Sequence, residues 1–280
     1  MKLSVSSYSF SQLLHSGEMK VTDCVRVAKE IGFDAVEFTG VTRDEAEAIR
    51  DESERLSMPV SNYTVGADFL QNDTEKEAER LYGEVEIARI LGATGMRHDA
   101  SYGVSREQRG FRRFEDFLPK MADGCRMVSE YAAQYGIRTM VENHGYFCQD
   151  SERVEKLVSA VSHTNFGLLV DMGNFTCVDE DPAVAVGRVA PYAFYVHAKD
   201  MFIRRGCMED PGEGFMCTRA GNYLRCTITG HGDVPVKQCL SVLKNAGYNG
   251  YVSLEFEGIE PAMMAIRIGY QNLRRYLSEI

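Results

Sequence analysis

The chain has 280 residues and an acidic balance, with 31 Lys and Arg against 41 Asp and Glu, which gives a formal net charge of −10. This length suits one large α/β barrel or two ordinary domains, and the negative charge argues against sequence-independent binding to nucleic acid and against a basic helix on a membrane surface. The first residues contain neither a membrane-spanning run nor a signal-peptide core, so we expect a soluble, cytoplasmic protein without a membrane partner.

Short β-like runs alternate with longer amphipathic segments along the whole chain. The eight expected strands are Leu3–Tyr8, Asp34–Phe38, Pro59–Tyr63, Gly95–His98, Ile137–Asn143, Phe166–Asp171, Ala193–His197 and Tyr251–Phe256. The eight expected helices are Val21–Ile31, Thr42–Leu56, Thr74–Leu91, Phe111–Tyr135, Ser151–Val161, Ala183–Val189, Val236–Ala246 and Pro261–Leu277. No Pro/Ser-rich linker or charge block interrupts this alternation, so residues 1–280 are expected to form a single domain.

Several expected helices end in a glycine just before the next strand, namely Gly32, Gly92, Gly136 and Gly247. Glycine tolerates the positive φ that a helix C-terminus followed by a strand requires. Repeated strand, helix and glycine units over this length predict an α/β fold of the (β/α)8 TIM barrel type. A doubly wound sheet is the alternative, but the glycine-rich turn that usually follows its first strand is missing here.

The longest irregular stretch runs from Lys199 to Val234, directly after the seventh expected strand. In a barrel this loop lies on the face that carries active sites, so we expect it to be a lid or a substrate loop. The eight cysteines form no CxxC pair and no regular spacing. We therefore expect free thiols in a reducing compartment, and a catalytic cysteine is the alternative.

Four strand ends carry groups that bind divalent cations: Glu142 in MVENHG, Asp171 in LLVDMGN, His197 in YVHAKD and Glu255 in VSLEFEG. In a barrel, the C-terminal ends of the strands meet at the mouth. Three carboxylates and one imidazole offer mainly hard ligands, which suit Mn²⁺ or Mg²⁺ and also accept Co²⁺, Fe²⁺ or Zn²⁺. We expect a divalent metal, with Mn²⁺ first among these ions.

A cation at the mouth would polarise a sugar carbonyl and stabilise the enediolate that forms when a neighbouring proton leaves. Glu142 and Glu255 are candidates to remove and return that proton from opposite faces of the sugar. His144 shares the strand parity of Glu142 and is a further candidate for the general base, because imidazole titrates near neutral pH.

Other polar residues are weaker candidates for substrate contact. Glu37 and His98 stand at strand ends and are suited to hydrogen bonding with sugar hydroxyls. Arg219 and Arg225 carry guanidinium groups that could bind substrate oxygen atoms, and a solvated or ion-paired surface role is the alternative. His231 lies between two glycines, where a contact with substrate and a tight turn are both consistent with the sequence.

The chain resembles the xylose isomerase-like TIM barrels, a group that includes D-tagatose 3-epimerase, inosose isomerases and dehydratases, and endonuclease IV. The segments that carry the resemblance are VENHG, VDMGN, VHAKD, GHGDVP and YNGYVSLEFEG. It implies a metal held by Glu142, Asp171, His197 and Glu255, of which the first and last exchange protons with the sugar. Where the epimerases commonly have a histidine after the strand-six aspartate, this chain has Asn174, which we count among the candidate substrate contacts.

The resemblance implies a divalent-metal-dependent isomerase or epimerase that acts on a sugar or keto-sugar. The combination of ENH, TRAGNYLR and GHGDVP also resembles the α subunits of C-glycoside deglycosidases, which are lyases that eliminate the aglycone from 3-oxo-C-glycosides and work with a small β subunit. In those enzymes a histidine at the position of His144 deprotonates the sugar. A non-enzymatic sugar-binding protein is the third alternative, and assembly into a homo-oligomer stays open.

Overall fold

Eight parallel strands form a closed barrel in the computed structural model, which describes residues 1–280. Their order around the barrel is β1-β11-β7-β6-β5-β4-β3-β2. The strands are β1 (Lys2–Ser6), β2 (Ala35–Thr39), β3 (Val60–Val65), β4 (Gly95–His98), β5 (Arg138–Glu142), β6 (Phe166–Asp171), β7 (Ala193–Ala198) and β11 (Tyr251–Leu254). The predicted (β/α)8 TIM barrel is therefore confirmed.

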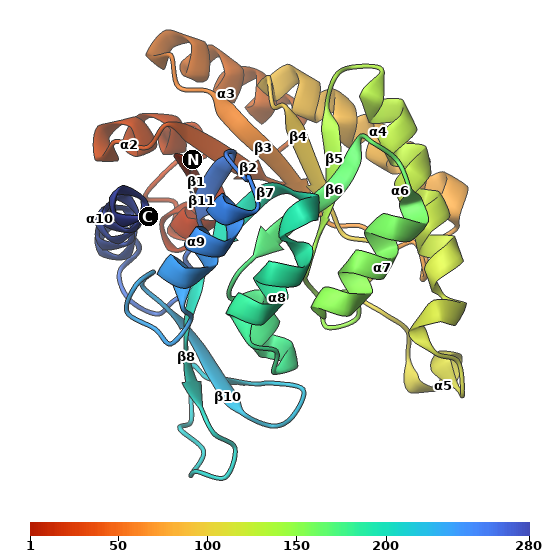
Figure 1. Cartoon of the computed structure of the whole chain (residues 1–280). Helices are drawn as coiled ribbons and strands as arrows, with labels where there is room; N and C mark the ends of the chain where they lie inside the picture. Colours follow the sequence, from red (N-terminus) through yellow and green to blue (C-terminus); the bar gives the residue numbers. More distant parts are fainter.

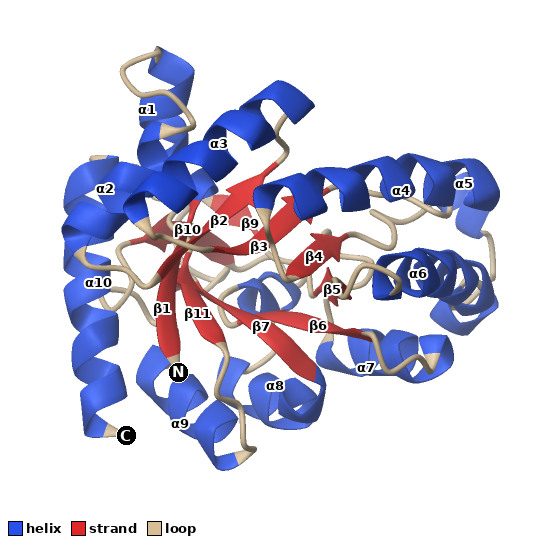
Figure 2. Ribbon diagram, turned by 90° about the horizontal axis from the view of Figure 1, so that it is seen from above, coloured by secondary structure: helices blue, strands red, loops and turns tan.

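Helices surround the strands on all sides, as Figure 2 shows. The helices that pack on the barrel are α2 (Asp23–Ile31), α3 (Arg43–Leu56), α4 (Thr74–Leu91), α6 (Leu118–Ala133), α7 (Ser151–Val161), α8 (Pro182–Val189), α9 (Val236–Asn245) and α10 (Ala262–Glu279). Two short helices, α1 (Ser11–Ser16) and α5 (Arg106–Arg109), lie in strand-to-helix connections. Most of the hydrophobic core is one cluster of 69 buried residues.

The glycines predicted to end helices have the expected backbone conformation. The φ angle is 112° at Gly32, 72° at Gly92, 70° at Gly136 and 90° at Gly247. Residues with a side chain are strained in this region, which explains why glycine stands where a helix turns back toward the next strand.

The predicted first residue of one helix was wrong. The segment Phe111–Tyr135 was expected to be a continuous helix, but α6 begins at Leu118 after a 3-10 turn over Phe114–Asp116. Pro119 stands in the first turn of α6, where its missing N–H leaves no hydrogen bond unmade. The apolar residues before it continue the helical pattern in sequence but belong to the connection.

The connection after β7 is also more ordered than predicted. Instead of an irregular loop, it contains an antiparallel sheet with the order β8-β10-β9, formed by β8 (Asp200–Arg204), β9 (Met216–Cys217) and β10 (Tyr223–Thr227). Figure 1 shows β8 and β10 projecting from the barrel with their loops. The sequence did not predict this sheet because β8 follows β7 almost without a break, and β10, with which β8 pairs, lies about twenty residues further along the chain.

The expectation of free thiols agrees with the structure, in which the eight cysteines form no disulfide and only Cys207 and Cys217 are exposed. No helix combines the length and the apolar character that crossing a membrane requires.

Candidate metal centre

The four predicted ligands converge at the mouth of the barrel. Glu142, Asp171 and His197 lie at the C-terminal ends of the neighbouring strands β5, β6 and β7, and Glu255 follows β11, which pairs with β7 on its other side. Each residue offers one ligand atom, and these four atoms lie within 4.8 Å of one another. All four residues are buried. A buried set of three carboxylates and one imidazole at this spacing fits a metal ion.

Two buried polar atoms in this cluster accept or donate no hydrogen bond, the Nδ1 of His197 and the Oδ2 of Asp171. Unpartnered buried polar atoms are uncommon in folded proteins and require an explanation. The remaining oxygen of Asp171, Oδ1, accepts from the backbone N–H groups of Gly173 and Asn174 at 2.8 and 3.0 Å. The carboxylate is therefore held so that Oδ2 is aimed into the cluster.

Lys199 brings a positive charge into the same cluster. Its Nζ lies 2.7 Å from Glu255, 3.3 Å from Asp171 and 3.0 Å from Glu257. The Lys199 side chain is 5% exposed, so these ion pairs are screened little by solvent. Lys199 follows His197 by two positions, and strand parity would have directed attention to it.

The pKa values reflect this crowding of charges. Burial raises the pKa of Asp171 to about 7, although Lys199 opposes the shift. Burial also disfavours the ionised form of Glu255, but His197 and Lys199 hold its pKa well below the ordinary value. A metal ion at this cluster would therefore compete with protons and with the ammonium group of Lys199.

A second group of charged residues forms the rim of the mouth beside Glu142. Arg97 lies 2.7 Å from Glu142 and 2.9 Å from Asp99, through Nη2 in both cases. Asp99 also accepts from Tyr102 Oη at 2.7 Å and from His144 Nδ1 at 3.2 Å. The other nitrogen of His144 is thus left free for a ligand, and 41% of the side chain is exposed.

Asp99 and His144, which are hydrogen-bonded on the rim, shift each other's pKa. Burial would raise the pKa of Asp99, but the Arg97 guanidinium and the hydrogen bond from His144 hold it at about 2. Burial would lower the pKa of His144, but Asp99 and Glu142 outweigh it and raise the pKa above the ordinary value. His144 therefore has an ionised, fixed partner, which is the arrangement that orients an imidazole for proton transfer.

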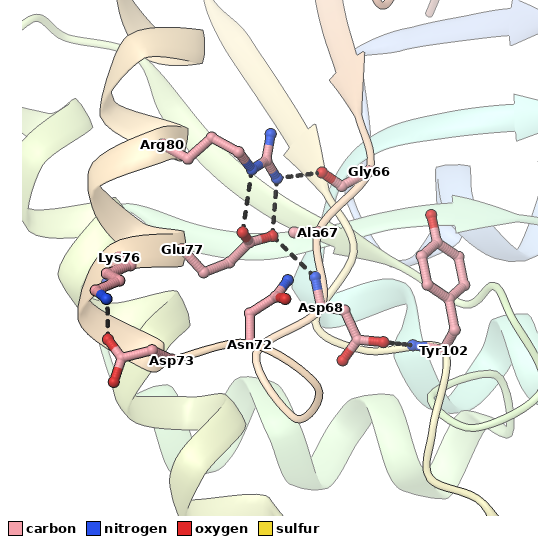
Figure 3. A pocket seen from close by; sticks show the side chains of 9 residues that line it. All are labelled: Gly66, Ala67, Asp68, Asn72, Asp73, Lys76, Glu77, Arg80 and Tyr102. Carbon is pink, nitrogen blue, oxygen red and sulfur yellow. Dashed lines mark hydrogen bonds and ion pairs between the residues drawn. The ribbon is translucent and has the colours of Figure 1, made fainter.

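Members of both groups line one pocket with a volume of about 270 Å³. Its walls include Tyr8, Arg97, Tyr102, Glu142, His144, Lys199, Glu255 and Glu257. A neighbouring depression of about 580 Å³ shares Gly66 and Tyr102 with it. Figure 3 shows this depression, with Arg80 and Glu77 on one side and Tyr102 on the other.

Two predicted substrate contacts lie elsewhere in the barrel. Glu37 is fully buried and accepts a hydrogen bond from His197 at 2.7 Å, so it faces the interior below the mouth. His98 is also fully buried, and its ring packs edge-on against Phe69. Side chains alternate along a strand, and on β4 it is Arg97 rather than His98 that points into the pocket. Burial lowers the pKa of His98 to about 4.

The remaining predicted contacts are also spread over the structure. Asn174 is brought into the cluster, because its Nδ2 donates to Glu142 Oε1 at 2.9 Å. Arg219 instead forms an exposed ion pair with Asp150, and Arg225 pairs with Glu260 at 3.5 Å. His231 stands in the turn before α9 and is absent from the pocket walls.

Sequence reasoning missed Arg97, Asp99 and Tyr102 as well as Lys199. Arg97 and Asp99 stand on either side of His98. Because side chains alternate along a strand, they point away from the face that His98 occupies, and this alternation could have identified them. Nothing local in the sequence points to Tyr102, since its contact with Asp99 depends on the turn that follows β4.

Comparisons with known proteins agree with this geometry. A family model described as xylose isomerase-like TIM barrel matches residues 25–276. The rhizopine catabolism protein MocC of Rhizobium meliloti is 24% identical over 277 residues, covering 92% of this chain and 82% of that protein. Inosose dehydratase 1 of Bacillus cereus is 26% identical over 154 residues, which span 53% of this chain and half of the dehydratase.

Among solved structures, the IOLI protein with a bound zinc atom has a TM-score of 0.74 and 18% sequence identity, and the superposition covers 100% of this chain and 99% of that one. At this identity the likeness shows the fold.

Proposed function

The chain belongs to the xylose isomerase-like TIM barrel family, and from that premise we propose that it is a divalent-metal-dependent isomerase or epimerase of a sugar or keto-sugar. The observation that carries the proposal is the meeting, at one barrel mouth, of four buried ligand groups and a half-exposed histidine paired with a carboxylate. The four ligand groups provide a site for a cation, and the histidine provides a group that can accept or donate a proton.

Glu142, Asp171, His197 and Glu255 would hold the cation, and Mn²⁺ is the ion we propose first. His197 Nδ1 and Asp171 Oδ2 make no hydrogen bond, and both atoms support this assignment. When bound, the cation would polarise a sugar carbonyl and favour loss of a proton from the neighbouring carbon. Arg97 and Asn174 orient Glu142 from two sides.

His144 is the group we assign to remove the proton. Its Nδ1 is engaged by Asp99, which leaves Nε2 to act on the substrate. Glu142 or Glu255, after taking up a proton from solvent, would deliver it on the other face, and these two glutamates are held in place by Arg97 and by Lys199 respectively. Return of the proton to the other face of the same carbon gives epimerisation, and return to the neighbouring carbon gives isomerisation.

A second function is favoured by the depression in Figure 3. It is larger than the mouth pocket and adjoins it at Tyr102, so a substrate with a bulky group attached to the reacting ring would have room for that group. Loss of the same proton followed by expulsion of the group would make the protein a lyase of the C-glycoside deglycosidase type. A small β subunit is proposed as the partner in that case.

The proposal is tested with protein that has been loaded with Mn²⁺ and freed of excess metal. Ketoses, 3-oxo-glucosides and 3-oxo-C-glycosides are incubated with it in deuterated water, and the products are identified by mass spectrometry and NMR. We expect deuterium at the carbon next to the carbonyl of at least one substrate, with chelator-treated protein as the control. Release of an aglycone would identify the lyase.

Two outcomes would count against the proposal. One is less than a tenth of an equivalent of any divalent transition metal bound after loading, which would favour a non-enzymatic sugar-binding protein. The other is the absence of proton exchange with every substrate in the panel despite full metal occupancy.

A further inference from the structure

We propose that Glu37 is a positioning residue that determines which nitrogen of His197 faces the metal. This inference rests on the proposed function, since it concerns the same cation site, but it assigns a role to a residue outside the ligand set. Glu37 lies on β2 and His197 on β7. These strands are separated in the barrel by β1 and β11, so the contact between the two side chains crosses the barrel interior.

The carboxylate of Glu37 has no free acceptor position toward solvent. Its Oε1 accepts from Asn62 Nδ2 and Thr64 Oγ1, both at 2.9 Å. Its Oε2 accepts from Ser253 Oγ at 3.0 Å and from His197 Nε2 at 2.7 Å. An ionised carboxylate is an acceptor only, with about four lone-pair sites. The four donors around Glu37 match that capacity.

This arrangement determines the protonation of the imidazole. Because Glu37 only accepts, Nε2 of His197 must carry the proton in their hydrogen bond. The other nitrogen, Nδ1, then faces the cluster, at 3.3 Å from Glu255, 3.8 Å from Glu142 and 3.9 Å from Asp171. It is the nitrogen that has no hydrogen-bond partner. The structure therefore assigns metal binding to Nδ1.

The burial of the pair makes the arrangement rigid. The side chain of His197 is 1% exposed and that of Glu37 is fully buried, so water cannot substitute for either partner. A carboxylate behind a ligating histidine orients the ring and increases its basicity, and loss of such a partner typically weakens metal binding by 10- to 100-fold. Glu37 should thus influence the cation without touching it.

The test begins with the wild-type protein loaded with Zn²⁺, a diamagnetic probe. Histidine ¹⁵N chemical shifts should place the proton of His197 on Nε2 and the metal on Nδ1. Coordination through Nε2 would overturn the inference. Because this measurement uses the intact chain, it stays informative even if a substitution at Glu37 prevents folding.

The second measurement is the affinity for Mn²⁺ of the E37Q variant, determined by competition with a chelating indicator. We expect affinity to fall by roughly 10- to 100-fold, with circular dichroism unchanged. E77Q is the matched control, because Glu77 is also a buried glutamate but pairs with Arg80 on α4, and its affinity should equal that of the wild type. Equal affinity of E37Q and the wild type would overturn the inference, as would an equal loss in E77Q.

Failure of the proposed function has a different signature. If the wild-type protein binds neither Mn²⁺ nor Zn²⁺, the cation site itself is absent. If it binds them and only the Glu37 tests fail, the cation site stands and the positioning role does not.

Discussion

Two histidine–carboxylate pairs lie at the barrel mouth, one buried beneath the pocket, which we call the floor, and one at the rim of the pocket. At the floor, His197 donates through Nε2 to Glu37 at 2.7 Å and is 1% exposed. At the rim, His144 contacts Asp99 through Nδ1 at 3.2 Å and is 41% exposed. The chemical pairing is the same, while the burial and the free nitrogen differ.

This difference fits the two roles that we propose for the same chemical pairing. A buried imidazole held by a strong hydrogen bond keeps one orientation, which suits a metal ligand. A half-exposed imidazole reaches the substrate and exchanges protons with solvent after each turnover, which suits an acid–base group. The position of each histidine relative to the barrel axis, rather than its partner, therefore separates the two.

The largest expected effect follows from a change at the floor. H197Q should retain less than a tenth of an equivalent of Mn²⁺ after dialysis and should lose turnover completely, because the cluster loses its only nitrogen ligand. Elemental analysis of the dialysed protein measures the metal content. Retention of metal near one equivalent would mean that the floor histidine does not differ in role from the rim histidine.

A change at the rim should separate metal binding from chemistry. H144Q should keep metal near one equivalent, while proton exchange with deuterated water falls by roughly 10²- to 10⁴-fold. NMR of the substrate measures the exchange. H163Q is the control, since His163 lies in the turn before β6, at the opposite end of the barrel, and its exchange rate should match the wild type. Wild-type exchange in H144Q would move the base to Glu142 or Glu255.

The smallest expected effect concerns acid stability. The pKa of Asp99 is about 2 in the folded protein, against an ordinary value of 3.8, so its ionised form stabilises the fold by about 2 kcal/mol. This contribution is present above the unfolded-state pKa and disappears as the pH falls through about 2. Denaturant unfolding of the wild type and D99N should therefore give a difference that is largest near pH 5, where Asp99 is ionised and its partner His144 is protonated, and that shrinks below pH 4. A constant difference at all pH values would contradict the assignment.

The alternation of strands and helices was readable from the sequence because each element carries its own local signal. β6 and α7 begin and end at the predicted residues, and α4 does as well. The sheet formed by β8, β9 and β10 was not readable in the same way, because strand pairing depends on residues that are distant in the chain. Pairing between distant segments leaves little trace in the local pattern.

The residues of the candidate site show the same contrast between local sequence signals and contacts that depend on the tertiary structure. The sequence alone determined that Glu142, Asp171, His197 and Glu255 come together, since parallel strands of a barrel present their C-terminal ends on one face. It did not determine that Arg97 rather than His98 enters the pocket, because the parity of a short strand depends on how the barrel closes. Only the tertiary structure placed Glu37 behind His197, since that contact joins two strands that are not neighbours in the barrel.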